Sequence, residues 1–240
     1  SGVGIMVSQY FGAKAREDLS NTIGTSIVLT ALVSVVLMVA AVPQFIHFLL
    51  DLLNTPAGDI YNGCANYLTI SILGIAGMAY YNILSGILRG MGDSVSALIY
   101  LLISTVTNIV LDILFVAQFN MGVPGVALAT VIAQGISSAL CLWKLLHMRE
   151  VFDLGKKQFK LSKKYIMQIV KLGLPSGLTQ AIFSSAMIVV QSLTNSFGKE
   201  FMAANVIVMR VDGFAMMPNF TFGMALTTFT GQNVGAGKFD

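Results

Sequence analysis

The sequence contains little charge for its size. Only 10% of its 240 residues are Asp, Glu, Lys or Arg, and 55% are hydrophobic, whereas soluble domains are about 25% charged. So few charged side chains cannot cover the surface that a water-soluble globule of this length exposes. A chain this hydrophobic is not disordered either. The composition therefore predicts a protein whose main solvent is lipid.

Cysteine and histidine are equally scarce, with two residues of each. Cys64 and Cys141 lie far apart and match no metal-binding or redox spacing, so we expect both to act as small hydrophobic side chains. His47 and His147 lie at helix ends on opposite faces of the expected bundle. The sequence therefore predicts no cofactor, no resident metal and no enzyme activity, and the net charge of +3 is too small to indicate a nucleic-acid partner.

Long hydrophobic runs are what the chain has instead. A hydrocarbon core of ~30 Å is crossed by ~20 helical residues, and runs of this length here are apolar on every side. Short connections such as 54–59, 89–93 and 120–125 make consecutive helices antiparallel neighbours. We therefore expect an all-α polytopic membrane protein with one truncated tail and six spans, at residues 1–11, 23–50, 66–88, 97–119, 126–146, 165–197 and 201–229.

The basic residues fall on one side of this expected bundle. The connections on the opposite side hold only Lys199, and Arg210 lies within a span. Because cytoplasmic loops are enriched in Lys and Arg, the crowded side is predicted to be cytoplasmic. Its basic residues are Lys14, Arg16, Arg89, Lys144, Arg149, Lys156, Lys157, Lys160, Lys163, Lys164, Lys171 and Lys238.

Two short segments repeat each other across the chain. Gln, Gly and Ala in residues 8–14 recur in residues 231–238 at a constant offset of 223. Six expected spans separate the copies, and an even number of spans gives both the same orientation, with the axis that relates them along the membrane normal. The repeat predicts two similar lobes, for which about 450 residues and twelve helices are needed. The chain would then be an internal fragment that holds about half.

Six short motifs follow one another along the chain: VSQYFGAK at 7–14, NILSGILRGMGD at 82–93, NIVLD at 108–112, GVPGVALAT at 122–130, LGLPSG at 172–177 and GQNVGA at 231–236. In this order they resemble the motifs of the multidrug and toxic compound extrusion (MATE) transporters. The resemblance covers nearly the whole chain, from the end of the family's second helix to the end of its eighth.

The resemblance implies twelve helices in two six-helix lobes around a central cavity. It divides this chain into most of the N-terminal lobe at 1–147, a cytoplasmic linker at 148–164 and the start of the C-terminal lobe at 165–240. It also implies a multi-pass protein of the cell membrane, acting as a monomer, that exports organic cations in exchange for Na⁺ or H⁺.

Asp112 is the best candidate for a mechanistic residue. A carboxylate within a span costs roughly 2.5–3.5 kcal/mol even on the mildest scale and indicates a functional site. Asn108 precedes it by one helical turn and shares its face, and Thr130 lies at a similar depth on the next, antiparallel helix. Carboxylate, amide and hydroxyl oxygens suit a hard cation such as Na⁺, and the carboxylate alone can carry a proton.

We therefore predict that Asp112, Asn108 and Thr130 couple transport to Na⁺ or H⁺, with transient Na⁺ binding at Asp112. One MATE branch has a similar Asn-x-x-x-Asp and Thr arrangement, completed by a carboxylate on the family's first helix, which precedes this sequence. The alternative is an interhelical hydrogen-bond cluster that only holds the lobe together.

Further polar residues within the expected spans are candidates to line a substrate cavity. Arg210 and Asp212 are two positions apart on a helix and point in different directions, so structural pairing with other helices is the alternative for both. Residues 180–185 contain no carboxylate, although some MATE branches carry a Glu there. The candidates are Tyr67, Asn82, Gln180, Gln191, Asn195, Arg210 and Asp212.

Two rival functions remain open at this point. A lipid-linked oligosaccharide flippase of the same superfamily would use a cation such as Arg210 to hold phosphate. A membrane-embedded lipid enzyme would need paired acids or a His–acid set at one depth, and the sequence offers neither.

Overall fold

The computed structural model describes residues 2–39, 42–52, 58–148, 150–155, 157–197 and 199–238. Within these ranges every regular element is a helix, which confirms the expected fold class. The expected connection at 54–57 and the basic residues Arg149 and Lys156 lie outside the described residues. The elements are α1 (Gly2–Gly12), α2 (Arg16–Val39), α3 (Pro43–Leu52), α4 (Asp59–Leu73), α5 (Ile75–Gly90), α6 (Ser94–Ile113), η1 (Leu114–Gln118), α7 (Gly122–His147), α8 (Lys163–Ser196) and α9 (Lys199–Gly235).

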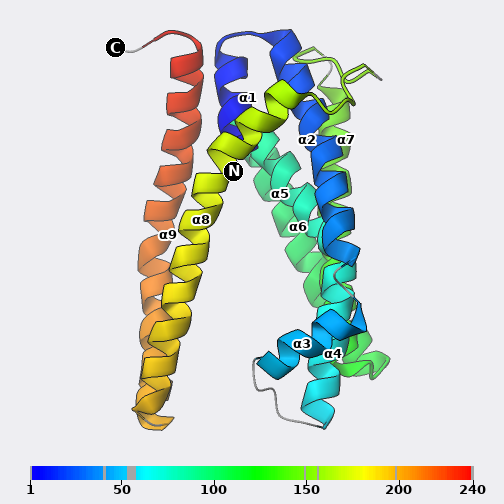
Figure 1. Ribbon diagram of the computed structural model, residues 1–240, viewed down its shortest axis with the longest axis vertical. Coiled ribbons are helices and arrows are strands. Elements are labelled where there is room, and N and C mark those ends of the chain that lie inside the picture. The colour runs from blue at the N-terminus through cyan, green and yellow to red at the C-terminus, as the bar shows by residue number, and fades with distance from the viewer. Residues whose placement is uncertain are drawn as a thin grey trace.

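The expected span at 23–50 is correct as a crossing but wrong in its bounds. α2 is long and apolar enough to cross a membrane, whereas residues 43–50 belong to a second helix, α3. α3 begins at Pro43, whose fixed φ suits the first position of a helix. Ile46 and Leu50, one turn apart on α3, are buried, while Phe45 and Phe48 are exposed. α3 is therefore a short amphipathic helix that lies across the direction of α2 (Figure 1).

The expected span at 66–88 is broken at Gly74, where α4 and α5 are bent by 47°. A Cβ on Gly74 would lie 2.6 Å from Cγ1 and 2.9 Å from Cβ of Val131 on α7. Only glycine therefore lets α7 approach the bend this closely. The hydrophobic run predicted a continuous helix because a contact with a distant segment leaves no mark on local periodicity.

The described residues contain four helices long and apolar enough to cross a membrane, or five if the bent pair α4–α5 is one span. α9 covers the expected span at 201–229 but is not among them. Polar residues interrupt its apolar sequence, among them Arg210, Asp212 and Asn219. The sixth expected crossing therefore remains a prediction that rests on the length of α9.

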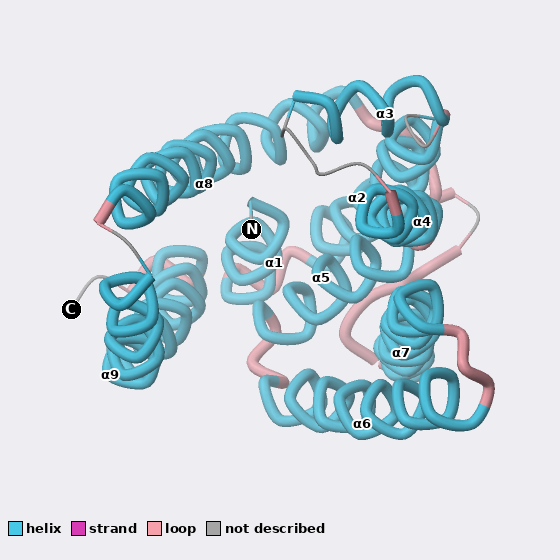
Figure 2. Tube along the Cα trace, turned by 90° about the horizontal axis from the view of Figure 1, so that it is seen from below, coloured by secondary structure: helices cyan, strands magenta, loops and turns pink. Residues whose placement is uncertain are grey.

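The helices form two groups that meet at one end of the molecule and separate toward the other (Figure 1). One group contains α2 to α7, and the other contains α8 and α9. α1 lies between them and packs against α2, α5, α8 and α9 (Figure 2). We call the end where the groups meet the basic end, because Lys14, Arg16, Lys164 and Lys238 lie there.

The buried core lies near this basic end. Val7, Ile23, Ile87, Leu88 and Leu145, from four helices, are almost completely inaccessible to solvent. Elsewhere the helices expose their apolar side chains, since 6% of the spanning window of α6 and none of that of α8 is buried. Helices with this exposure need lipid or further helices around them. The two groups are thus held together from the basic end.

The two copies of the repeat end in the same backbone conformation. Lys14 after α1 and Gly237 after α9 both adopt positive φ, at 52° and 69°, and they close equivalent caps on the last turn. Three backbone hydrogen bonds of the first cap recur 223 residues later. The bond from Ala13 N to Gln9 O corresponds to that from Ala236 N to Gln232 O, and the bond from Lys14 N to Phe11 O corresponds to that from Gly237 N to Val234 O. The bond from Ala15 N to Tyr10 O corresponds to that from Lys238 N to Asn233 O. The sequence repeat is therefore also a structural one.

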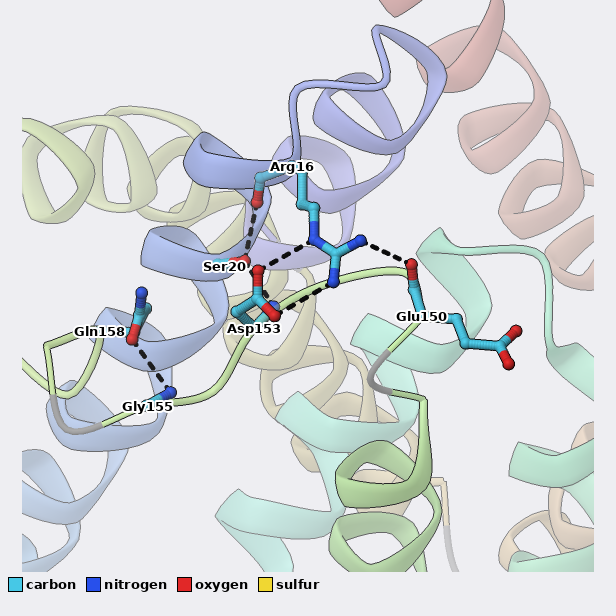
Figure 3. A network of polar contacts seen from close by, with 6 residues as sticks. All are labelled: Arg16, Ser20, Glu150, Asp153, Gly155 and Gln158. Carbon is cyan, nitrogen blue, oxygen red and sulfur yellow. Dashed lines mark hydrogen bonds and ion pairs between the residues drawn. The ribbon is translucent and has the colours of Figure 1, made fainter.

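The segment after α7 is fastened along α2. Nε and Nη2 of Arg16 donate to the carboxylate of Asp153 at 2.9 and 3.1 Å, and Nη1 donates to the backbone carbonyl of Glu150 at 2.8 Å (Figure 3). The backbone N–H of Asp153 donates to Oγ of Ser20 at 2.9 Å, and the neighbouring Phe152 is buried. The hydrogen bonds from Arg16 hold the pKa of Asp153 below its usual value.

α8 is also joined to α2 at its first turn. Nζ of Lys164 and Oη of Tyr165 both donate to Oδ1 of Asp18, at 2.9 and 2.8 Å. Thr25 Oγ1 donates to the carbonyl of Lys160 at 3.0 Å. The predicted linker therefore carries the start of α8 in a fixed position against α2.

Candidate functional site

The structure brings together two of the three predicted coupling residues. Nδ2 of Asn108 on α6 donates to Oγ1 of Thr130 on α7 at 3.3 Å. The Thr130 hydroxyl in turn donates to the carbonyl of Val126, one turn earlier, at 3.0 Å. Since this contact uses the amide nitrogen of Asn108, its amide oxygen is left to accept a hydrogen bond or bind a cation.

Asp112 lies one turn from Asn108 on the same face of α6. Its Oδ1 is buried and has no hydrogen-bond partner in the described part of the chain. A buried carboxylate oxygen without a partner is destabilising, so a bound cation or proton would relieve it. The geometry therefore places an unsatisfied acceptor one turn from the Asn108–Thr130 pair.

The backbone changes conformation just beyond Asp112. α6 ends at Ile113, and η1 continues it as one π-helical turn in which Phe119 N donates to Leu114 O at 3.1 Å. π-helical turns inserted beside α-helices occur frequently at functional sites. The turn widens the helix immediately after the candidate carboxylate, on the side away from the basic end.

Gln134 is a polar residue that the sequence reasoning missed. It lies one turn from Thr130 on the same face of α7, and its Oε1 is buried without a hydrogen-bond partner among the described residues. The same four-residue spacing that paired Asn108 with Asp112 connects Thr130 with Gln134. This spacing was the sequence signal that could have identified Gln134.

The predicted cavity residues Tyr67 and Asn82 lie apart from the Asn108–Thr130 pair. Tyr67 on α4 is 39% exposed. Asn82 on α5 is exposed, and its amide donates to the carbonyl of Met78 on its own helix at 2.8 Å. Neither side chain is hydrogen-bonded to the coupling candidates in the described ranges, so both remain predictions.

The remaining cavity candidates lie on the α8–α9 group. Gln180 and Gln191 on α8 and Arg210 and Asp212 on α9 are exposed. Arg210 and Asp212 form no ion pair within the described ranges, so the alternative that they pair structurally has no support inside this part of the fold. The side chain of Asn195 lies outside the described residues.

The two histidines differ in their surroundings. Nδ1 of His47 lies 3.0 Å from Oη of Tyr61, which donates to Oδ1 of Asp51 at 2.9 Å. Nδ1 of His147 lies 2.8 Å from the carbonyl of Trp143 on its own helix. No group of three His, Cys, Asp or Glu side chains in the described ranges is arranged to hold a metal ion.

A cavity of about 890 Å³ lies at the basic end. Residues from the caps of both repeats line it, including Phe11, Lys14, Gln232 and Lys238. It contains none of the predicted coupling or substrate residues. It therefore belongs to the contact between the repeats and not to the Asp112 region.

Comparison with known proteins places this geometry in context. Residues 1–114 and 175–240 match the MatE family. The probable multidrug resistance protein YoeA of Bacillus subtilis is 34% identical over 248 residues, which cover 100% of this chain and 53% of YoeA. The probable multidrug resistance protein NorM of Thermotoga maritima is 25% identical over 241 residues, covering 99% of this chain and 51% of that protein.

Solved structures of transporters also match this chain. An outward-facing multidrug resistance MATE family transporter of the MOP superfamily matches with a TM-score of 0.90 and 25% identity, over 99% of this chain and 52% of that one. A MOP superfamily transporter from Pyrococcus furiosus, described as having a binding pocket of reverse polarity that suggests a different function, matches with a TM-score of 0.89 and 25% identity, over 99% and 52%. The chain thus spans about half the length of the relatives it matches.

Proposed function

The chain belongs to the MatE family, and from this premise we propose that the whole protein is a secondary active multidrug exporter. In this proposal it expels amphipathic organic cations by antiport with Na⁺ or H⁺ and acts as a monomer. The family's relatives and the apolar helices identify it as a multi-pass protein of the cell membrane. Because relatives matched over the whole chain are described as probable multidrug resistance proteins, small organic molecules are the favoured cargo.

Asp112 carries the coupling part of the proposal. Its buried Oδ1 without a partner among the described residues is an acceptor for one proton or one cation. With Na⁺, the amide oxygen of Asn108 and the hydroxyl of Thr130 would supply further oxygen ligands. With H⁺, the carboxylate alone would be neutralised, and the Asn108–Thr130 pair would only position α6 against α7.

The α8–α9 group supports a route for hydrophobic cargo. α9 exposes Phe214, Phe220 and Phe222 together with Arg210 and Asp212. Exposed aromatic side chains suit varied apolar ligands and organic cations. Arg210 and Asp212 point in different directions, and of the two only the carboxylate of Asp212 would attract a cationic cargo.

The flippase alternative would require Arg210, and not Asp212, to contact the cargo. Arg210 would face the cargo and hold a lipid-linked phosphate, as guanidinium groups do. Family membership and the multidrug relatives favour export over this alternative, and also over a lipid enzyme, because the named relatives are resistance proteins and transporters. The comparison of Arg210→Gln with Asp212→Asn separates the two: export of cations depends on Asp212, whereas phosphate recognition depends on Arg210.

The deciding experiment is efflux of a fluorescent organic cation from vesicles that contain the whole protein. Na⁺ and pH gradients are imposed separately, so that the coupling ion is identified in the same assay. We expect one of the two gradients to drive efflux. Failure of both gradients to move any cation tested would overturn the proposal.

Two further variants identify how the coupling ion is held. If Na⁺ is the ion, Asn108→Ala and Thr130→Ala should each raise the Na⁺ concentration needed for half-maximal efflux several-fold. If H⁺ is the ion, both variants should keep their pH dependence, because neither side chain carries the proton. Asp112→Asn should show no gradient-driven efflux with either ion.

A further inference from the structure

α1 and α9 touch through equivalent positions of the repeat. A Cβ on Gly12 would lie 2.8 Å from Cα of Gln232, and a Cβ on Gly235 would lie 2.9 Å from Cα of Gln9. Because Gln9 corresponds to Gln232 and Gly12 to Gly235, the two contacts are the same contact made twice. This reciprocity is the signature of a two-fold interface. Small residues are required because the two backbones approach directly.

Gln232 extends this contact to a third helix. Its Nε2 donates to the backbone carbonyl of Gly90 at 2.9 Å. Gly90 is the last residue of α5, where backbone carbonyls have no partner within their own helix. A Cβ on Gly92 would lie 3.7 Å from the same nitrogen. One side chain of the α8–α9 group is therefore bonded to the end of α5 in the other group.

The α1–α9 contact and the start of α8 join the two groups in different ways. α8 is tied to α2 by the hydrogen bonds from Lys164 and Tyr165 to Asp18 and by the chain itself. No chain connection links α9 to α1 or α5 within the described residues. A rotation of the α8–α9 group about the start of α8 would therefore part α9 from α1 and α5.

We propose that the α1–α9 contact, made by Ser8, Gln9, Gly12, Gly231, Gln232 and Gly235, is the inner gate of the transporter, and that Gln232 is its latch on α5. The proposal rests on the proposed transport function. In the present structure the gate is closed, because the groups meet at the basic end and separate toward the other (Figure 1). Opening toward the basic end requires the glycine contacts to part and the Gln232–Gly90 hydrogen bond to break.

The gate can be measured directly in the whole protein. Nitroxide labels replace Lys14 and Lys238, which belong to the two caps and line the cavity at the basic end. Cys64, Cys141 and any cysteine in the rest of the whole protein are replaced by Ala so that labelling is specific. Double electron–electron resonance in lipid nanodiscs then reports how many molecules have short or long separations between the two labels.

We expect Gly12→Ala and Gly235→Ala to shift most molecules to the longer separation, because the added methyl groups cannot fit between the backbones. Gln232→Met, which keeps the size but loses the donor, should raise the ratio of open to closed molecules about fivefold, as the loss of one neutral hydrogen bond predicts. Gly223→Ala is the matched control on α9, since a Cβ there has no neighbour within 4 Å. It should give the wild-type distribution.

Unchanged distance distributions in folded Gly12→Ala and Gln232→Met would overturn the gate. If the glycine variants do not fold, Gln232→Met decides alone, because it adds no bulk to the contact. Efflux is measured on the same samples. A shifted distribution with no efflux in any variant or in wild type overturns the transport proposal and shows only that the α1–α9 contact closes the basic end. Efflux without any shift in Gln232→Met overturns the gate.

Discussion

Ser8 and Gly231 are equivalent residues of the two repeats, and they pack directly against each other. A Cβ on Gly231 would lie 2.9 Å from Cβ of Ser8. A residue contacts its own equivalent only where a two-fold axis passes between them. The axis expected from the sequence repeat therefore runs through the α1–α9 contact at the basic end.

This axis predicts a role for Gln9. Its equivalent, Gln232, is bonded to Gly90, whereas the Gln9 side chain forms no hydrogen bond within the described residues. In the whole protein, Gln9 should donate to the end of the helix that takes the place of α5 in the second lobe. Gln9→Ala and Gln232→Ala should then raise the open fraction of the inner gate by similar factors, measured by the same label pair.

The double variant provides the control for this symmetry. Two separate hydrogen bonds should give a double variant that is more open than either single one. A normal distance distribution in Gln9→Ala beside a shifted one in Gln232→Ala would show that the latch exists on one side alone.

Asp112→Asn should reduce gradient-driven efflux to the background rate. The amide keeps the shape of the carboxylate but carries neither the proton nor the negative charge that would bind a cation. Gradient-driven dye uptake into inverted vesicles, which corresponds to export from the cell, is measured and normalised to the amount of protein in the membrane. The control is Asp51→Asn, at an exposed aspartate on α3, and it should keep the wild-type rate. A wild-type rate in Asp112→Asn would contradict the coupling role of Asp112.

Much of the fold was accessible from the sequence because lipid imposes simple rules. Long apolar runs predicted the helices, and the exposed faces of α6 and α8 fit that environment. The breaks at Pro43 and Gly74 were missed, since runs of hydrophobic residues continue across both. Pro43 carried a local signal that a new helix begins. Gly74 carried no such signal, because glycine is needed there for the contact with Val131, a residue distant in the sequence.

The sequence predicted those parts of the candidate site that helical spacing determines. Antiparallel neighbours and equal depth brought Asn108 to Thr130, and they now lie 3.3 Å apart. Gln134 was missed although its spacing from Thr130 was visible. The fastening of Asp153 to Arg16 could not be predicted, because it depends on where a polar loop lies in space and not on any periodicity.

Gly74→Ala should destabilise the protein through its contact with α7. The added methyl group would overlap the side chain of Val131, and overpacking of this kind costs about 1–3 kcal/mol. Thermal unfolding in detergent, followed by size-exclusion fluorescence, should show a lower midpoint. Val131→Ala in the same chain should restore part of it. Gly63→Ala is the matched control on α4, because its nearest neighbour would lie 3.8 Å away, and a loss of equal size there would contradict the explanation.

Asp153→Asn should loosen the segment that follows α7. The amide cannot form the paired, charge-assisted contact that Arg16 makes with the carboxylate. Limited trypsin digestion at neutral pH should therefore cleave after Lys157 and Lys160 several-fold faster than in wild type. Glu150→Gln is the control, because Arg16 contacts only the backbone carbonyl of Glu150 and its side chain points away (Figure 3). Equal cleavage rates in the two variants would contradict this role of Asp153.

The same contact gives the segment a defined pH dependence. The hydrogen bonds from Arg16 lower the pKa of Asp153 from its usual 3.8, so the ionised carboxylate favours the fastened state. This contribution is fully present above the pKa of the free side chain and disappears as the pH falls through the lowered pKa. A nitroxide at position 157 should remain immobile from neutral pH down to the usual pKa of Asp153 and become mobile below it. In Asp153→Asn the label should be mobile at every pH, and a wild-type label that loosens near neutral pH would assign the transition to another group.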